Sequence, residues 1–199
     1  MLKKTVPVRS YTGEQWKTNK TNKKYLAIDF DHRCAYCDDL DSVYAGRESY
    51  AVEHFAPKEK FPKLEYTYDN LLYACRFCNT FKSDDWPSDS PTVNIVGDRG
   101  YIDPCTNEYY EHLDRDENTG CIYYKTEIGK YMYEHLRLYL KRHSIIFMVE
   151  KLEEKRTELK ASIDNDIEKG FDVSKKEQAL FILDNEFFSY YSQLRFENE

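Results

Sequence analysis

Four of the six cysteines form two matched pairs whose spacing is typical of a metal site. Each pair has the form Cys-x-x-Cys, and residues 38–74 separate the two pairs. A Cys-x-x-Cys turn directs two thiolates to one tetrahedral centre, and four thiolates leave no open coordination position. The sequence therefore predicts one structural Zn²⁺ bound by Cys34, Cys37, Cys75 and Cys78. Redox pairs are the alternative, but no βαβ pattern surrounds either pair.

The segment that links the pairs carries residues suited to phosphodiester hydrolysis. This reaction needs a base that takes a proton from water, and His54 suits the role because a free imidazole has a pKa near ~6.5. It also needs a hard cation to polarise the phosphate, and Mg²⁺ prefers oxygen ligands and keeps several waters. Asn79 offers a carboxamide oxygen and Glu53 a carboxylate. These two residues are the predicted ligands of a catalytic Mg²⁺ or Mn²⁺.

Three further residues are predicted to support this chemistry. Asn70 would fix the loop that precedes it and so hold the imidazole of His54. Lys58 and Lys82 are predicted phosphate contacts, since Lys82 lies three residues after Asn79 on the same helix face. Each of the three also has a simpler interpretation. Asn70 is a common turn residue, and both lysines are typical solvated side chains.

A strand, a loop, a second strand and a helix are needed to position these residues. Residues 50–56 alternate like a short strand, and Pro57 ends the run. Residues 68–74 form a polar turn that enters an apolar strand, and residues 75–82 begin a helix. Neighbours on a regular strand point to opposite faces. Glu53 and His54 therefore share one metal ion only if the end of the strand twists.

This combination of residues resembles an HNH endonuclease. The resemblance rests on Glu53-His54, Asn70-Leu71 and Cys75-x-x-Cys78-Asn79-x-x-Lys82 with the upstream cysteine pair, and it covers residues 30–90. It implies an α+β fold with a ββα-metal core, one catalytic divalent ion and DNA as the substrate. It also implies that His54 activates water, Asn70 orients the loop and Asn79 binds the metal. Asn79 stands where a third signature His is usual, and Glu53 where an Asp is common.

A narrower resemblance is to the HNH subunit of Septu-type bacterial anti-phage systems. It rests on residues 52–58, 101–105 and 111–113 and on the helical tail. This resemblance implies a large ATPase as a partner and the C-terminal helices as the surface that contacts it. Two alternatives stay open at this point. One is a zinc-tied scaffold without catalysis, and the other is a ribonuclease, for example one acting on tRNA, with the same site.

The distribution of charge limits how nucleic acid could be bound. The chain carries a net charge of −7, yet residues 1–24 hold seven Lys and Arg residues and a single Glu. The basic start is predicted either as a frayed, solvated tail or as an arm that follows phosphates. The acidic remainder means that nucleic-acid binding is local or helped by a partner. Neither a membrane span nor a secretory signal is recognisable, so we expect a cytoplasmic protein without membrane contact.

Composition divides the chain into four parts. These are a basic segment (1–29), a zinc-tied nuclease core (30–90), a connector with short strands (91–125) and a C-terminal helical subdomain (126–199). The last part contains no proline, and its apolar residues recur at steps of three and four. It predicts one helix from about Gly129 to Glu168 and another from Ser174, where Ser174 to Glu177 has the form of a capping box. Gly170 permits the reversal, so the subdomain is an antiparallel α-helical hairpin.

Overall fold

The computed structural model describes residues 2–10, 18–43 and 46–196. They fall into two compact units, the first within residues 1–117 and 121–140, and the second within residues 118–120 and 141–199. The boundary expected at residue 126 is not a boundary in the structure, because the helix α4 (Glu127–His135) belongs to the first unit. Within the described ranges, no helix is long and apolar enough to cross a membrane.

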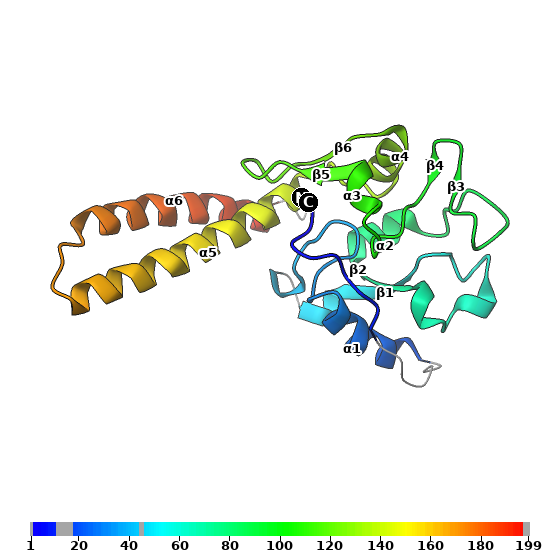
Figure 1. Cartoon of the computed structure of the whole chain (residues 1–199), viewed down its shortest axis with the longest axis horizontal. Helices are drawn as coiled ribbons and strands as arrows, with labels where there is room; N and C mark the ends of the chain where they lie inside the picture. The colour runs from blue at the N-terminus through cyan, green and yellow to red at the C-terminus, as the bar shows by residue number, and fades with distance from the viewer. Residues whose placement is uncertain (1, 11–17, 44–45, 197–199) are drawn as a thin grey trace. The chain divides into compact units, whose positions relative to one another are not determined.

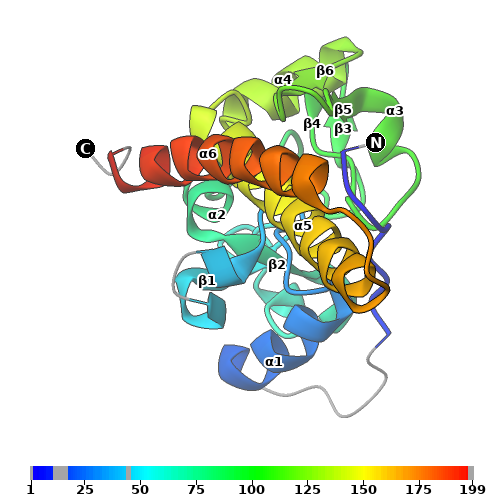
Figure 2. The same ribbon diagram turned by 90° about the vertical axis from the view of Figure 1, so that its left-hand side faces the viewer.

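The core of the first unit is the strand, strand and helix order that the sequence predicts. Strands β1 (Tyr50–His54) and β2 (Leu71–Cys75) form an antiparallel hairpin, and α2 (Arg76–Lys82) follows β2 directly. In this hairpin Tyr50 pairs with Cys75 and His54 with Leu71. Helix α1 (Asn19–Asp29) packs on one face of the hairpin and α2 on the other (Figures 1 and 2). Burial on both faces explains why β2 is apolar throughout.

Short elements surround this core and connect it to the helices that follow. The 3₁₀ turns Asp41–Val43 and Gly46–Ser49 precede β1, and the turns Pro62–Leu64 and Tyr68–Asn70 lie between β1 and β2. The predicted connector forms two small antiparallel pairs and a single helical turn. They are β3 (Ile95–Val96) with β4 (Arg99–Gly100), α3 (Tyr109–His112), and β5 (Leu113–Arg115) with β6 (Ile122–Tyr124).

Residues 2–10 pack against the first unit, so the prediction of a frayed tail is wrong for them. Leu2 is buried. The Arg9 guanidinium donates to both carboxylate oxygens of Asp103, at 2.9 and 3.2 Å, and to the Leu71 carbonyl at 2.9 Å. Arg9 thus ties this segment to the start of β2 through a partner that is distant in the sequence. Residues 11–17 of the basic segment lie outside the described residues.

The long helix predicted from Gly129 to Glu168 is two helices, α4 and α5 (Lys141–Glu168). The chain turns at Arg137, which has a left-handed φ of 51°. The N–H of Leu138 donates to the Tyr133 carbonyl at 2.9 Å, which closes the end of α4 in the manner of a Schellman motif. Neither Gly nor Pro marks this position. The apolar spacing therefore continues across a break that only the backbone shows.

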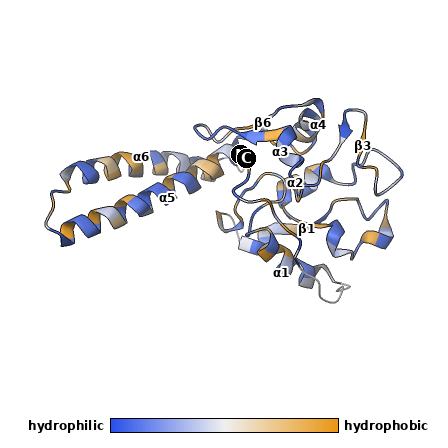
Figure 3. Cartoon of the chain, viewed as in Figure 1, coloured by the Kyte–Doolittle hydropathy of each residue, from blue (hydrophilic) through white to orange (hydrophobic). Residues whose placement is uncertain are grey.

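Helices α5 and α6 (Ser174–Phe196) form the antiparallel hairpin of the second unit, as predicted, and lie side by side in Figure 1. Gly170 adopts a left-handed φ of 73° in the turn. Apolar and polar residues alternate along both helices (Figure 3), as expected where each helix has one face against the other. The reversal at Gly170 therefore has the role that the sequence indicated.

The capping box predicted at Ser174 is wrong. The Oδ1 atom of Asp172 accepts hydrogen bonds from the N–H of Ser174, at 3.0 Å, and from its hydroxyl. The first backbone bond of the helix runs from the N–H of Glu177 to the Val173 carbonyl. Ser174 therefore already lies inside α6, and the capping acceptor is the carboxylate two residues earlier.

We expect Gly129→Ala to destabilise the first unit, although Ala favours a helix over Gly by about 1 kcal/mol. A Cβ at Gly129 would lie 2.1 Å from the carbonyl oxygen of His112, a backbone atom that cannot move aside. The expected loss is about 2–4 kcal/mol in the free energy of unfolding, measured in urea. Gly170→Ala measures backbone strain alone for comparison: a Cβ there meets nothing within 4 Å, and its left-handed φ of 73° is expected to cost about 1–2 kcal/mol. Unchanged stability of Gly129→Ala would contradict this close approach.

Candidate active site

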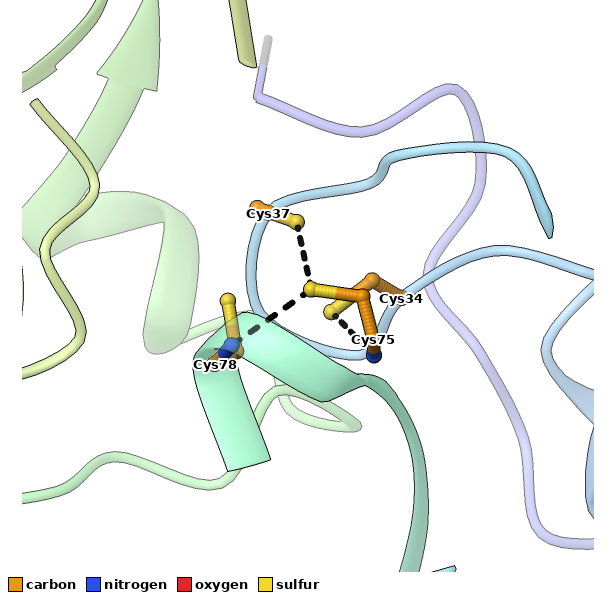
Figure 4. Close-up of side chains that lie close together, drawn as sticks. All are labelled: Cys34, Cys37, Cys75 and Cys78. Carbon is orange, nitrogen blue, oxygen red and sulfur yellow. Dashed lines mark hydrogen bonds between the residues drawn. The ribbon is translucent and has the colours of Figure 1, made fainter. Parts of the chain in front are cut away.

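The four paired cysteines converge on one point of the first unit (Figure 4). Cys34 and Cys37 come from the loop before β1, Cys75 ends β2, and Cys78 lies in the first turn of α2. Their sulfur atoms all lie within 4.8 Å of one another, and the Sγ atoms of Cys37 and Cys75 are 3.8 Å apart. A tetrahedron with metal–sulfur bonds of ~2.3 Å has edges of about 3.8 Å. The donor set therefore fits Zn²⁺.

Backbone bonds connect this cluster to the hairpin. The N–H of Cys75 donates to the sulfur of Cys34 at 3.3 Å, and the N–H of Cys78 donates to the sulfur of Cys75 at 3.5 Å. The N–H of Ala35 donates to the Tyr73 carbonyl at 2.7 Å. The cluster thus joins the loop before β1 to the end of β2 and to the start of α2.

An open pocket of about 600 Å³ lies where the end of β1 faces α2. Its lining includes four residues that the sequence singled out, namely Glu53, His54, Lys58 and Asn79. It also includes Thr80, Ser83 and Asp84, which come from α2 and the turn after it. The other two predicted residues, Asn70 and Lys82, do not line the pocket. Asn70 bonds the backbone that follows His54, and Lys82 pairs with Glu53.

His54 is held in one orientation and one tautomer. Its Nε2 lies 2.9 Å from the carbonyl oxygen of Glu65. Because a carbonyl only accepts hydrogen bonds, Nε2 carries the ring hydrogen and Nδ1 is the acceptor. Burial lowers the pKa of His54 below 6.5, and the positive charge of Lys58 lowers it further, against the effect of the bond to Glu65. The imidazole is therefore neutral at pH 7, with a free acceptor nitrogen.

Asn70 holds the chain immediately after His54. Its Oδ1 accepts from the N–H of Ala56, and its Nδ2 donates to the carbonyl of Ala56, both at 2.9 Å. Its own carbonyl accepts from the N–H of Phe55 at 2.9 Å. These three bonds hold the loop in the way that the sequence analysis expected. The importance of Asn70 for catalysis stays a prediction.

Glu53 is buried at the back of the pocket and is paired with Lys82. The Nζ of Lys82 lies 2.8 Å from Oε1 of Glu53 and donates to the carbonyl of His54 at 3.1 Å. The Tyr36 hydroxyl also donates to Oε1, at 3.4 Å. Burial raises the pKa of Glu53, and the ammonium of Lys82 opposes this shift. Glu53 and His54 do line one pocket, but Lys82 occupies one oxygen of the carboxylate.

The predicted phosphate contact by Lys82 is wrong. Its side chain is 0% exposed, and its ammonium also lies 5.3 Å from the centroid of the Tyr101 ring. The three-residue spacing from Asn79 placed it near the pocket, but the hairpin covers it because Lys82 turns toward β1. Lys82 is an internal counter-charge for Glu53. Lys58 lines the pocket and is half-buried, so a phosphate contact by Lys58 stays a prediction.

We expect Lys82→Met to lower the free energy of unfolding by about 3–5 kcal/mol, because Glu53 would stay buried without its partner. The double variant Glu53→Gln with Lys82→Met removes both charges and is expected to recover part of this loss. Urea unfolding of the zinc-loaded proteins measures both effects. Lys58→Met is the control, with an expected change below about 1 kcal/mol. A loss of stability in the double variant that equals the sum of the losses in Lys82→Met and in Glu53→Gln alone would contradict the pairing.

The pocket offers oxygen donors for a divalent cation. These are the carboxamide of Asn79 and the carboxylates of Glu53 and Asp84, which fit a hard ion. Over the ranges that the structure describes, no three Asp, Glu, His or Cys ligand atoms of this pocket lie within 4.8 Å of one another. An ion here would take only part of its ligand shell from these oxygens and the rest from water, as Mg²⁺ commonly does.

Asp84 is a pocket residue that the sequence reasoning missed. It follows Ser83, whose left-handed φ of 50° ends α2 and turns the chain. The available signal was the acidic pair Asp84-Asp85 just after a helix. Such a pair is usually a solvated turn, so the pattern alone does not distinguish a ligand from a surface residue.

Comparison with known proteins agrees with this geometry. Residues 34–85 match the family model of the HNH endonuclease. The chain is also similar to the Septu protein PtuB of Bacillus thuringiensis, with 34% identity over 71 residues. That match covers 34% of this chain and 26% of the relative, so the two proteins share only part of their lengths. No solved structure matches.

Proposed function

We propose that the HNH domain of residues 34–85 is catalytic and that the chain is a metal-dependent endonuclease hydrolysing phosphodiester bonds. DNA is the expected substrate, and RNA is the alternative. His54 carries this proposal, because a base with a fixed tautomer and a lowered pKa lines the same pocket as Asn79. A titratable group with a perturbed pKa in an open polar pocket is typical of an active site.

Five side chains that line the pocket have proposed roles in this reaction. His54 takes the proton of the attacking water at Nδ1, while the carbonyl of Glu65 holds the opposite side of the ring. Asn79 and Glu53 would hold a Mg²⁺ or Mn²⁺ ion, with Asp84 as a further donor. When bound, that ion polarises the phosphate and stabilises the leaving oxygen. Lys58 contacts a phosphate oxygen at the rim, and the four cysteines hold a structural Zn²⁺.

A cleavage assay on two polymers tests the proposal. The zinc-loaded protein is mixed with supercoiled plasmid or with total RNA, each with Mg²⁺, with Mn²⁺ and with neither. Cutting that requires the divalent ion supports the nuclease and identifies its polymer. A folded, zinc-loaded protein that cuts neither polymer, alone or with a Septu-type ATPase added, would contradict the proposal and favour the scaffold.

We further propose that the chain is the effector subunit of a bacterial anti-phage complex with a large ATPase as its partner. The match to a Septu protein and the net charge of −7 support this, since an acidic subunit gains from a partner that helps to hold nucleic acid. Phage infection of bacteria that express both proteins tests it. Protection that survives without the ATPase would contradict the partnership.

The acid limb of the pH profile of kcat/KM is expected below pH 6.5. His54 accepts a proton only when neutral, and its lowered pKa keeps it neutral to a lower pH than a free imidazole. Lys58→Gln removes a charge that lowers this pKa, so its acid limb is expected to move upward. Cleavage rates of a labelled oligonucleotide between about pH 5 and pH 8 measure the acid limb of the parent protein and that of Lys58→Gln. Lys63→Gln, an exposed lysine away from the pocket, is the control. A limb that stays in place in Lys58→Gln would contradict this assignment.

A further inference from the structure

Lys3 is a cation buried in the first unit. It lies in the segment of residues 2–10, and its side chain is 3% exposed. Within the part of the chain that the structure describes, its ammonium has no hydrogen-bond partner. Moving an ammonium out of water is costly, and a protein keeps such a group buried where nearby negative charge offsets the cost. The position of Lys3 therefore calls for a source of negative charge beside it.

The surroundings of Lys3 lead to the cysteine cluster. Lys3 and Cys34 line the same small cavity, whose volume of about 10 Å³ has room for about one water molecule. The ammonium lies 5.3 Å from the centroid of the Tyr109 ring. The hydroxyl of Tyr109 donates to the carbonyl of Tyr36 at 2.9 Å, and Tyr36 lies between Cys34 and Cys37. Lys3 thus lies beside the turn that carries the first cysteine pair.

Asp38 also lines this cavity, but its carboxylate is paired with Arg33. The Nη1 of Arg33 lies 3.5 Å from Oδ2 of Asp38 and donates to the carbonyl of Asp38 at 3.1 Å. Burial lowers the pKa of Lys3, and negative charge on Asp38 and on the neighbouring cysteines raises it. Because Arg33 balances Asp38, the described residue of the cavity that is left to balance Lys3 is Cys34, together with its cluster.

The cluster would carry an excess of negative charge when it holds Zn²⁺. Four thiolates and one divalent ion form a dianion. Positive groups and hydrogen-bond donors around metal ligands commonly strengthen metal binding. Arg115 is one such group, since it is 4% exposed and donates to the carbonyl of Cys37 at 2.6 Å. Lys3, next to Cys34, is a second buried cation on the same turn.

We propose that Lys3 is the counter-charge of the zinc–thiolate cluster and that residues 2–10 help to retain the metal through it. The thiolates make the burial of Lys3 tolerable, and Lys3 offsets part of their charge. The segment is fixed on both sides of Lys3, because Leu2 is buried and Arg9 bonds Asp103. The fold of the segment thus keeps the ammonium beside the cluster. This inference rests on the structural Zn²⁺ of the proposed function and is independent of the hydrolysis.

Zinc retention by the full chain tests this role. The apparent Kd for Zn²⁺ is measured by competition with a chromogenic chelator. Lys3→Met keeps an unbranched side chain and removes the charge, so the Kd is expected to rise by about 10- to 100-fold. Lys4→Met, at the exposed neighbour, removes the same charge from the chain and is the matched control, with an expected change below about twofold.

A purely structural role for Lys3 predicts the opposite sign. If the side chain only fills space, Met removes a costly buried charge, and the Kd of Lys3→Met stays the same or falls. Either result would overturn the proposal. A parent chain that binds no zinc would contradict the metal site itself and the inference with it. A zinc-loaded parent with an unchanged Kd in Lys3→Met would overturn the inference alone.

Asp38→Asn tests whether Lys3 is instead the partner of Asp38. Asn tolerates the left-handed φ of 64° at this position. Removing the carboxylate takes negative charge away from the cluster, so the Kd for Zn²⁺ is expected to stay the same or to fall. A rise like that expected for Lys3→Met would identify Lys3 and Asp38 as the charge pair and overturn the proposal. If Lys3→Met does not fold, Asp38→Asn decides between these outcomes.

Cobalt substitution separates charge from packing. Co²⁺ replaces Zn²⁺ in tetrahedral thiolate sites, and its sulfur-to-metal charge-transfer bands respond to the electron density on sulfur. Loss of a nearby cation is expected to move these bands to longer wavelength in Lys3→Met and to leave them in place in Lys4→Met. Bands that stay at the parent wavelength in a folded Lys3→Met protein would show that the ammonium does not act on the thiolates, and would overturn the proposal.

Discussion

Replacement of His54 by Ala is expected to lower the rate of phosphodiester cleavage by about 10²- to 10⁴-fold, the usual contribution of general acid–base catalysis. The imidazole is the group of the pocket with a neutral acceptor nitrogen near pH 7, because its Nε2 hydrogen is committed to the Glu65 carbonyl. His54→Gln is expected to be as slow as His54→Ala. Its amide can donate to the same carbonyl but cannot take a proton from water.

The matched control for this prediction is His135→Ala. His135 also bonds a backbone carbonyl through a ring nitrogen, with Nδ1 2.9 Å from the Tyr131 oxygen, but it lies outside the pocket. Its removal tests the cost of losing a histidine-to-backbone bond without touching the chemistry. Zinc content and the urea midpoint are measured for all variants. A His54→Ala protein that keeps full activity would remove His54 from the mechanism and favour the scaffold.

Loss of the cysteine cluster is expected to unfold the first unit. Metal binding at such a site is worth about 10–16 kcal/mol in small zinc domains, which equals or exceeds the whole stability of a typical domain. Cys75→Ser is the most informative variant, because Cys75 ends β2 and its sulfur also accepts from the Cys78 N–H at the start of α2. The expected result is loss of bound zinc and of the cooperative urea transition of this unit.

Cys121→Ser is the control for the cluster, since Cys121 is an exposed cysteine of the same unit. It is expected to keep one zinc per chain and the parent midpoint. Metal analysis and unfolding monitored by tyrosine fluorescence measure both variants. A Cys75→Ser protein that keeps one zinc and an unchanged midpoint would show that the cluster is not the metal site that the spacing predicts.

The sequence predicted the cluster, the hairpin and α2 because local patterns specify them. The Cys-x-x-Cys spacing, the alternation that ends at Pro57 and the apolar run Leu71–Cys75 each require only neighbouring residues. His54 and Asn79 then line the same pocket because β1 and β2 pair along their full length and α2 follows β2 at once. This part of the fold is encoded in short segments, and the segments agree with one another.

The errors share a different cause. Whether Lys82 faces solvent or β1 depends on a rotation of α2 that spacing from Asn79 does not determine, and burial decided it. The partner of Arg9 is Asp103, and a pair so far apart leaves no local pattern. The break at Arg137 uses a residue that favours helices, so the intrinsic propensities predicted continuity. Tertiary contacts decided all three.

The position of Cys75 has a consequence for changes in chain length. This residue is at once the end of β2, the pairing partner of Tyr50 and a member of the metal cluster. β2 therefore cannot slide along β1 without withdrawing a ligand, so an ion held by the four thiolates would fix the strand register. A one-residue slip would exchange the faces of Glu53 and His54. Single-residue insertions within either strand should be far more harmful than insertions of the same size in the loop of residues 58–66, where the register is already set.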